Sequence, residues 1–109
     1  MKVVMEVDVS PFQNPHGVLA KKLHDTEHVD VIRIELEPGQ TLKPHATPVD
    51  VFFYVLEGDP TVQIGDERER VAEGSLVYSP ADIPHLVANE GDTRVCFLVV
   101  KTPNPRTRK

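Results

Sequence analysis

The sequence predicts an all-β domain in which antiparallel strands form a sandwich or a barrel. Ten prolines and six glycines divide the 109 residues into short segments, with a turn signal about every seven to twelve residues. These segments are rich in valine and other β-branched residues, which favour strands over helices. The chain length corresponds to one domain with a single core.

The first half of the chain contains one clear strand, at residues 31–37. Apolar and charged side chains alternate there with a period of two, which is typical of a strand with one buried face. A Pro-Gly pair at residues 38–39 then ends the strand with a turn. Nearer the N-terminus, residues 3–9 also alternate like a strand, whereas residues 17–24 fit either a strand or one to two helical turns.

The second half is expected to consist of short strands separated by turns. We expect these strands at residues 50–56, 61–64, 68–72, 75–78, 85–89 and 93–101. The segment 50–56 is apolar on both faces, so Phe52, Tyr54 and Leu56 need a second buried surface, either another sheet or a subunit. Because twofold dimers are the commonest oligomers, we expect a homodimer.

Charge and hydropathy argue against several classes of partner. Twelve Lys and Arg against 17 Asp and Glu give a net charge of −5, which does not suit binding to a phosphate backbone. The apolar runs are far shorter than the about 20 residues that cross a bilayer, and acidic residues interrupt the N-terminal segment. The lone cysteine, Cys96, lies in an apolar run and is expected to be a buried, inert thiol. We therefore expect a cytoplasmic protein that binds neither nucleic acid nor membrane.

Two stretches are more specific in their spacing than in their composition. The residues that define them are Gly39, His45 and Gly58 in the first, and Gly74, Pro80, His85 and Asn89 in the second. In this spacing the chain resembles the cupin superfamily, whose members are small barrels of the jelly-roll type, also called double-stranded β-helices. The resemblance implies an antiparallel jelly-roll β-barrel. One departure is Asp82, which stands where the second motif of the family has a glycine.

The expected barrel divides the single domain into three parts. Residues 29–101 are expected to form the barrel itself. Residues 1–28 are expected to supply an N-terminal strand or strands and an irregular segment packed on the barrel. Residues 102–109 are basic and interrupted by prolines, so we expect a flexible tail rather than a binding arm.

The resemblance also implies a metal site. In metal-binding cupins, two histidines and a glutamate of the first motif converge inside the barrel with the histidine of the second. His45 and His85 match the first and the last of these positions. Thr47 and Val51 stand where the family has the second histidine and the glutamate, so two of the four implied ligands are missing.

Asp50 offers a carboxylate close in sequence to these positions. A set of two histidines and one carboxylate suits Fe(II), and Mn, Ni or Zn also accept such ligands. Because side chains alternate along a strand, an inward-facing Val51 would turn Asp50 outward unless a bulge after Pro48 shifts the register. Both orientations are open from the residues, and His45, His85 and Asp50 are the candidate metal ligands.

A mostly apolar pocket with a few polar groups is expected around the two histidines. The expected lining residues are Lys43, Thr47, Val51, Phe53, Val55 and Tyr78. Lys43 shares the face of His45 and could pair with an anionic ligand. His16 and Asp30 are expected to be solvent-exposed surface groups.

Two functions follow from this pattern and stay open at this point. The first is a metal-dependent enzyme that acts on a small anionic or oxygen-rich molecule through one divalent transition metal. The alternative is a non-catalytic module that binds or senses a small molecule and has lost the metal site. No P-loop or GxGxxG motif is present, so no nucleotide cofactor is expected. Both functions place a small-molecule ligand inside the barrel.

Overall fold

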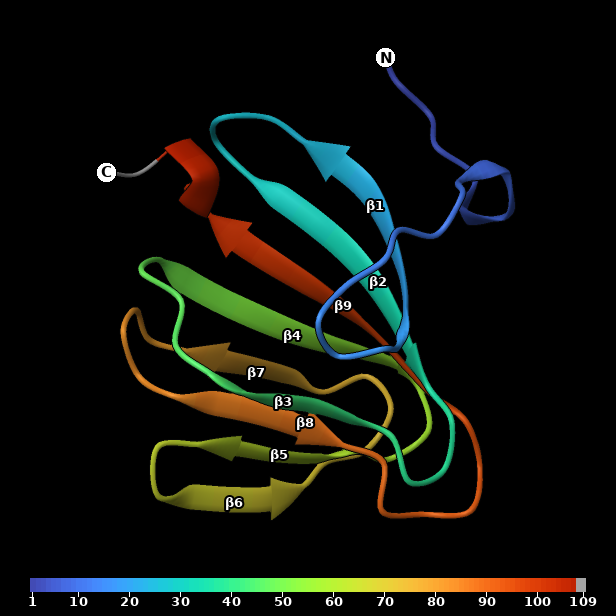
Figure 1. The fold of residues 1–109 in the computed structure, drawn as a ribbon, viewed down its shortest axis with the longest axis vertical. Helices are drawn as coiled ribbons and strands as arrows, with labels where there is room; N and C mark the ends of the chain where they lie inside the picture. The colour runs from blue at the N-terminus through green and yellow to red at the C-terminus, as the bar shows by residue number, and fades with distance from the viewer. Residues whose placement is uncertain (108–109) are drawn as a thin grey trace.

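Two antiparallel sheets pack against each other in the computed structural model, which describes residues 1–107 (Figure 1). The larger sheet has the strand order β1-β2-β9-β4-β7 and the smaller one β3-β8-β5-β6. The strands are β1 (Leu19–Asp25), β2 (Asp30–Leu36), β3 (Thr41–His45), β4 (Asp50–Glu57), β5 (Thr61–Ile64), β6 (Glu67–Arg70), β7 (Leu76–Ser79), β8 (His85–Ala88) and β9 (Val95–Thr102). Two 3-10 helices, η1 (Glu6–Asp8) and η2 (Pro105–Thr107), flank them. The all-β, antiparallel class predicted from the sequence is confirmed.

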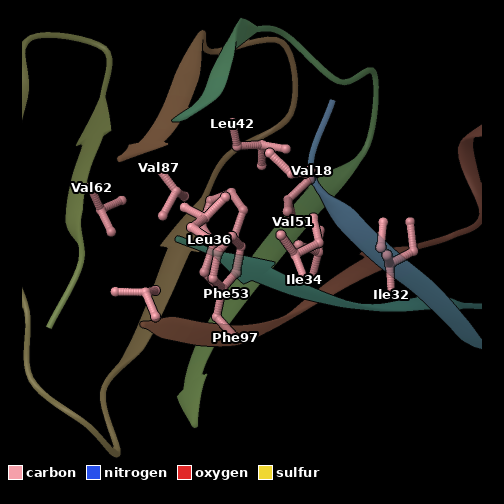
Figure 2. Close-up of a cluster of buried hydrophobic side chains, with 13 residues drawn as sticks. Val18, Ile32, Ile34, Leu36, Leu42, Val51, Phe53, Val62, Val87 and Phe97 are labelled. Carbon is pink, nitrogen blue, oxygen red and sulfur yellow. The ribbon is translucent and has the colours of Figure 1, made fainter. Parts of the chain in front are cut away.

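Alternation along β4 decides which side chains form the core. Val51, Phe53 and Val55 are each 1% exposed, whereas Tyr54 and Leu56 on the opposite face are 39% and 42% exposed. The inward-facing side chains of both sheets meet in one apolar cluster, in which the rings of Phe53 and Phe97 pack edge to face 6.0 Å apart (Figure 2). The core therefore lies between the sheets, and four apolar side chains on the outer face of the larger sheet stay exposed, namely Tyr54, Leu56, Leu76 and Tyr78.

The barrel begins earlier than predicted. Residues 19–25 form β1, which pairs antiparallel with β2 and is one edge of the larger sheet, so the barrel starts near residue 19 and not at residue 29. Residues 3–9, predicted as a strand, join no sheet and contain η1. Residues 3–9 do alternate between apolar and polar side chains, but no strand of either sheet pairs with them, and a single unpaired strand is not stable.

The C-terminal end differs from the expected flexible tail up to residue 106. β9 runs to Thr102, and the Asn104 side chain, only 1% exposed, donates hydrogen bonds to Asp25 Oδ1 (2.6 Å) and to the Thr26 carbonyl (2.9 Å). Arg106 adds an ion pair to Asp25 at 3.0 Å. The segment is thus fastened to the β1–β2 turn. Arg108 and Lys109 lie outside the described residues.

Cys96 behaves as expected of a structural thiol. It is fully buried in β9, and this burial raises its pKa to about 11, so the thiol stays protonated and unreactive at neutral pH. Within residues 1–107, no helix has the length and apolar character needed to cross a membrane.

Candidate functional site

The two motif histidines meet at one end of the smaller sheet. His45 is the last residue of β3 and His85 the first of β8, and the two are direct cross-strand partners. The ladder is irregular between Leu42 and His45, where Pro44 lacks the N–H that a regular ladder needs. The Nε2 atoms of the two histidines lie 3.2 Å apart, and their rings pack edge to face at 4.5 Å.

A chain of hydrogen bonds holds both imidazoles. His45 Nδ1 lies 2.8 Å from the Lys43 carbonyl, which can only accept, so this nitrogen carries the proton. In the neutral pair, His45 Nε2 then accepts from the Nε2–H of His85. His85 Nδ1 in turn accepts from the hydroxyl of Ser79, 2.7 Å away and fully buried on β7. The chain therefore connects the larger sheet, which carries Ser79, to the smaller one.

A third imidazole, that of His16, stands beside this pair. It lies in the loop before β1, where Asn14 Oδ1 accepts the His16 backbone N–H at 3.1 Å. Its Nδ1 accepts the backbone N–H of Lys43 at 2.9 Å, and its ring centre is 5.3 Å from that of His45. The expectation of a solvent-exposed surface histidine is wrong. No strand periodicity covers this loop, so the sequence carries no signal for the placement of His16.

Lys101 completes the group of basic side chains. It follows Val95, Phe97 and Val99 on the inward face of β9, and it is the cross-strand partner of Asp30. Asp30 is 3% exposed, with Oδ1 at 3.3 Å from the Lys22 ammonium, so the expectation of a solvated carboxylate is wrong. The alternation of β9 is the signal in the sequence that could have placed Lys101 inside.

These four basic residues line a cavity of about 170 Å³. Its walls are Phe12, Asn14, Pro15, His16, Val18, Ala20, Ile32, Ile34, Leu42, His45, Phe53, His85, Val99 and Lys101. Drug-sized ligands occupy pockets of about 300–1,000 Å³, so this cavity suits a smaller molecule. It combines apolar walls with basic side chains, and none of its described lining residues is acidic.

Burial lowers the pKa values of three basic side chains that line the cavity. It lowers the pKa of His85 to about 4, with smaller contributions from His45 and Lys101. The pKa of His16 is also lowered, first by burial and then by His45, Lys43 and Lys101. Burial lowers the pKa of Lys101, and Asp30 partly offsets this. Positive charge in the cavity is thus disfavoured until a counter-charge enters.

The structure places the expected lining residues in different surroundings. Phe53 lines the cavity, with its ring 5.2 Å from that of His85. The remaining five do not line it: Lys43, Thr47, Val51, Val55 and Tyr78. Val51 and Val55 face inward but lie in the core, Thr47 is buried, the side chain of Lys43 is exposed, and Tyr78 lies on the outer face of the larger sheet.

Asp50 is not brought to the histidines. Its Oδ1 accepts hydrogen bonds from the Tyr78 hydroxyl (3.2 Å) and from the backbone N–H of Ala81 (3.1 Å). The β4 ladder is regular from Asp50 to Val55, so no bulge turns this carboxylate inward. The alternation argument holds, and the structure does not bring Asp50, expected as a third ligand, to His45 and His85.

The described residues do not form a complete metal site. Two nitrogens 3.2 Å apart are compatible with one shared ion, because tetrahedral ligands at 2.0–2.1 Å lie about 3.4 Å from each other. However, no three His, Cys, Asp or Glu side chains within residues 1–107 are arranged to hold a metal ion. Lys101 also adds a basic group to the same cavity. These donors do not fit a divalent cation.

The fold is a small antiparallel β-barrel with an internal cavity, and the comparisons give its family. Residues 32–101 match the cupin domain, and the chain belongs to the cupin family. An uncharacterized protein of Methanocaldococcus jannaschii is 32% identical over 89 residues, which cover 81% of this chain and 77% of the relative.

Two solved structures agree with the predicted jelly-roll fold. A protein of Thermus thermophilus superposes with a TM-score of 0.84 at 30% identity, over 96% of this chain and 100% of the other. An RmlC-like cupin family protein of Methanocaldococcus jannaschii, described as having a double-stranded β-helix fold, gives a TM-score of 0.79 at 28% identity, over 97% of this chain and 94% of the other. The jelly-roll barrel is therefore confirmed.

Proposed function

We propose that this protein binds a small organic anion, such as a carboxylate, in the cavity formed by His16, His45, His85 and Lys101, without a metal ion. One observation carries the proposal: all titratable side chains that line the cavity are basic, although the whole chain has a net charge of −5. A carboxylate only accepts hydrogen bonds, and two groups offer it donors: the Lys101 ammonium, and the Nε2–H of His16, whose Nδ1 accepts from the Lys43 backbone. The N–H groups of His45 and His85 already donate to the Lys43 carbonyl and to His45, so these two imidazoles shape the wall of the cavity. Of the two functions left open by the sequence, the cavity favours the non-catalytic binding module.

The walls of the cavity narrow the ligand class further. Aliphatic side chains and Phe53 form most of the lining, while the loop before β1 and the strands β3, β8 and β9 each contribute one basic group. A ligand with a compact apolar body and one anionic group satisfies both parts of this lining. The volume of about 170 Å³ limits that body to a short aliphatic chain or a single ring.

Calorimetry with matched probes tests the proposal. Benzoate and acetate serve as anionic probes, and benzamide is the neutral isostere of benzoate. We expect at least one anion to bind and benzamide to bind at least tenfold more weakly, because it lacks the charge that the basic groups stabilise. Lys101→Met should weaken anion binding at least tenfold, whereas Arg68→Met, which removes a cation from the exposed strand β6, should leave it unchanged.

Metal analysis separates this function from the metal-dependent enzyme. We expect less than about 0.1 equivalent of Fe, Mn, Ni or Zn in protein purified without chelator, also after these metals are added. About one equivalent that disappears in both His45→Ala and His85→Ala would establish the metal-dependent reading instead. Failure of both anions to bind, or equal binding of benzoate and benzamide, would also overturn the proposal.

A further inference from the structure

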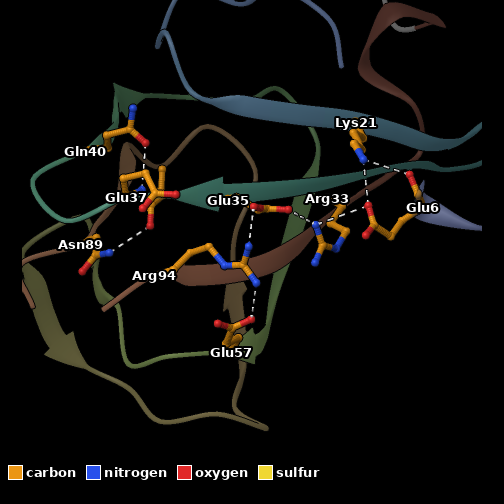
Figure 3. A network of polar contacts seen from close by, with 10 residues as sticks. Glu6, Lys21, Arg33, Glu35, Glu37, Gln40, Glu57, Asn89 and Arg94 are labelled. Carbon is orange, nitrogen blue, oxygen red and sulfur yellow. Dashed lines mark hydrogen bonds and ion pairs between the residues drawn. The ribbon is translucent and has the colours of Figure 1, made fainter. Parts of the chain in front are cut away.

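Two half-buried lysines of the larger sheet each have a carboxylate partner. Lys21 on β1 pairs with Glu6 at 2.9 Å, as Figure 3 shows. Its neighbour Lys22 pairs with Asp30 at 3.3 Å. In both cases the carboxylate offsets the cost of taking an ammonium group out of water. A half-buried lysine that lacks such a partner therefore stands apart in this fold.

Lys101 is such a lysine. It is half-buried, and its ammonium group forms no hydrogen bond or ion pair with any residue that the structure describes. Its cross-strand neighbour Asp30 does not reach ion-pair distance and is held by Lys22 instead. Lys2 and Lys43 also lack a carboxylate partner among residues 1–107, but both are exposed to solvent. Within this range, only Lys101 is both withdrawn from water and without a paired carboxylate.

The side chain of Lys101 faces an apolar part of the cavity wall. Ile32, Phe53 and Val99 line the same cavity, and none of its described lining residues is acidic. Burial lowers the pKa of Lys101, and Asp30 offsets this only in part, so the fraction of neutral amine at neutral pH is raised. A neutral lysine amine in an apolar pocket is a nucleophile toward carbonyl carbons.

His16 offers a separate donor for the charge of a ligand. Its Nδ1 accepts the backbone N–H of Lys43 at 2.9 Å, so its Nε2–H remains for a carboxylate. His16 and Lys101 line one cavity, and the charge of Lys101 contributes to lowering the pKa of His16. One small molecule can therefore meet both groups, with its carboxylate at His16 and an electrophilic carbon at Lys101.

We propose that Lys101 forms a reversible imine with a short oxo acid whose carboxylate accepts the Nε2–H of His16. This inference rests on the proposed function, because it assigns the small organic anion to the aldehydes and ketones that carry a carboxylate. The cavity volume of about 170 Å³ limits such a ligand to a few carbon atoms. The ligand is then held by one covalent bond and one charge-assisted hydrogen bond.

Formation of the imine is balanced by the release of one water molecule. The lone pair of the Lys101 amine attacks the carbonyl carbon, and a proton moves from the nitrogen to the carbonyl oxygen. The C–O bond then breaks, the second N–H proton leaves with the oxygen as water, and a C=N bond remains. A proton from solvent makes the imine cationic, so a positive charge stays beside the carboxylate.

Reductive trapping tests the imine. The protein is treated with pyruvate and cyanoborohydride at pH 7, and peptide mapping by mass spectrometry locates the modified lysines. We expect Lys101 to be modified at least tenfold faster than the exposed Lys43, because its amine is less protonated and the carboxylate is bound beside it. Methyl pyruvate, which lacks the charge, should not show this preference. Excess benzoate should slow modification of Lys101 but not of Lys43, since it occupies the same cavity.

Two variants assign the rapid adduct. Lys101→Arg should lose it, because a guanidinium does not form an imine, and should still bind acetate more tightly than Lys101→Met, because it keeps a cation in the cavity. Lys43→Arg is the matched control: its side chain is exposed, and the rapid adduct should persist. The mapping of wild-type protein decides the proposal even where a variant does not fold.

The outcomes separate this inference from the proposed function. Equal rates at Lys101 and Lys43 would overturn the imine, and the proposed function would stand if acetate or benzoate still binds in calorimetry. Equal modification of Lys101 by pyruvate and methyl pyruvate would overturn the assignment to an oxo acid. If neither acetate nor benzoate binds, the proposed function is overturned as well.

Discussion

His85 carries the largest consequence for stability at the scale of single residues. It is 3% exposed, and the folded protein holds its pKa at about 4, compared with about 6.5 in the unfolded chain. Below pH 6.5 the unfolded chain therefore takes up a proton that the folded protein refuses. The stability contributed by neutral His85 is complete above pH 6.5 and is lost as the pH falls toward 4, by up to about 3 kcal/mol.

This predicts a specific pH dependence of unfolding. Urea titrations in EDTA at pH 7.5, 5.5 and 4.5 should show the free energy of unfolding falling with pH, and His85→Gln should reduce that slope because the variant cannot titrate at this position. Carboxylates contribute equally to both proteins, so the comparison isolates the imidazole. Identical slopes for wild type and variant would contradict the prediction.

Gly39 and Gly58 stand at the two ends of the first motif. Replacing each of them would distinguish the cost of a strained backbone from the cost of a steric clash. Gly39 and Gly58 have φ values of +87° and +82°, which L-residues adopt only at a cost. A Cβ at Gly39 would meet no atom within 4 Å, whereas one at Gly58 would lie 2.7 Å from the Arg94 carbonyl oxygen.

We expect Gly39→Ala to destabilise the fold by about 1–2 kcal/mol, and Gly58→Ala by at least about 1 kcal/mol more. Urea unfolding of both variants measures the difference. Equal losses would show that the backbone at Gly58 moves aside without cost. Asp82 belongs to the same class of position: its φ is +67°, which explains physically why the family motif has a glycine there.

At the scale of structural elements, the C-terminal segment stabilises the β1–β2 turn through contacts of Asn104 and Arg106 with Asp25 and Thr26. Asn104→Ala removes the part-buried hydrogen bonds to Asp25 and to the Thr26 carbonyl as well as the one accepted from the Arg106 backbone N–H, so we expect a loss of about 1–3 kcal/mol in urea unfolding. Arg106→Ala is the control, since its ion pair with Asp25 is largely exposed and should contribute less than about 1 kcal/mol. A smaller effect for Asn104→Ala than for Arg106→Ala would contradict this role.

Alternation predicted the strands well wherever one face is buried. The pattern of β2 and β4 gave their inward faces, and the same logic placed Asp50 outward. The alternation was not followed at the start of β2, where Asp30 was expected to be solvated in spite of its inward position. Asp30 is in phase with the core, and two cations offset the cost of its burial: Lys22, 3.3 Å from its Oδ1, and Lys101, its cross-strand partner on β9.

The candidate site was predictable only in part. The spacing of the motifs led to His45 and His85, which lie on strands with a fixed register. His16 lies on an irregular loop, and its position depends on tertiary hydrogen bonds to Asn14 and to the Lys43 backbone. Such contacts between distant segments leave no periodic signal in a single sequence.

For the whole molecule, the homodimer expected from the sequence predicts a melting temperature that depends on protein concentration. If the outer face of the larger sheet, where Leu76 and Tyr78 are exposed, is buried against a second copy, unfolding includes dissociation, and Tm should rise by several degrees between 2 µM and 200 µM. Leu76→Glu should remove this dependence, whereas Arg68→Met, on the exposed strand β6 of the smaller sheet, should keep it. A wild-type Tm independent of concentration would contradict a dimer in this range.

The loop with His16 lies outside both sheets, yet it forms one wall of the cavity. Its residues can therefore be exchanged during evolution without disturbing the strand ladders or the apolar core. Under the proposed function, a change in this loop would alter which molecule is bound at little cost to folding, whereas a change at His85 would alter both binding and folding. The sequence of this loop can thus vary among related chains while the strands stay the same. The preference for a proposed ligand could then change without a change of fold.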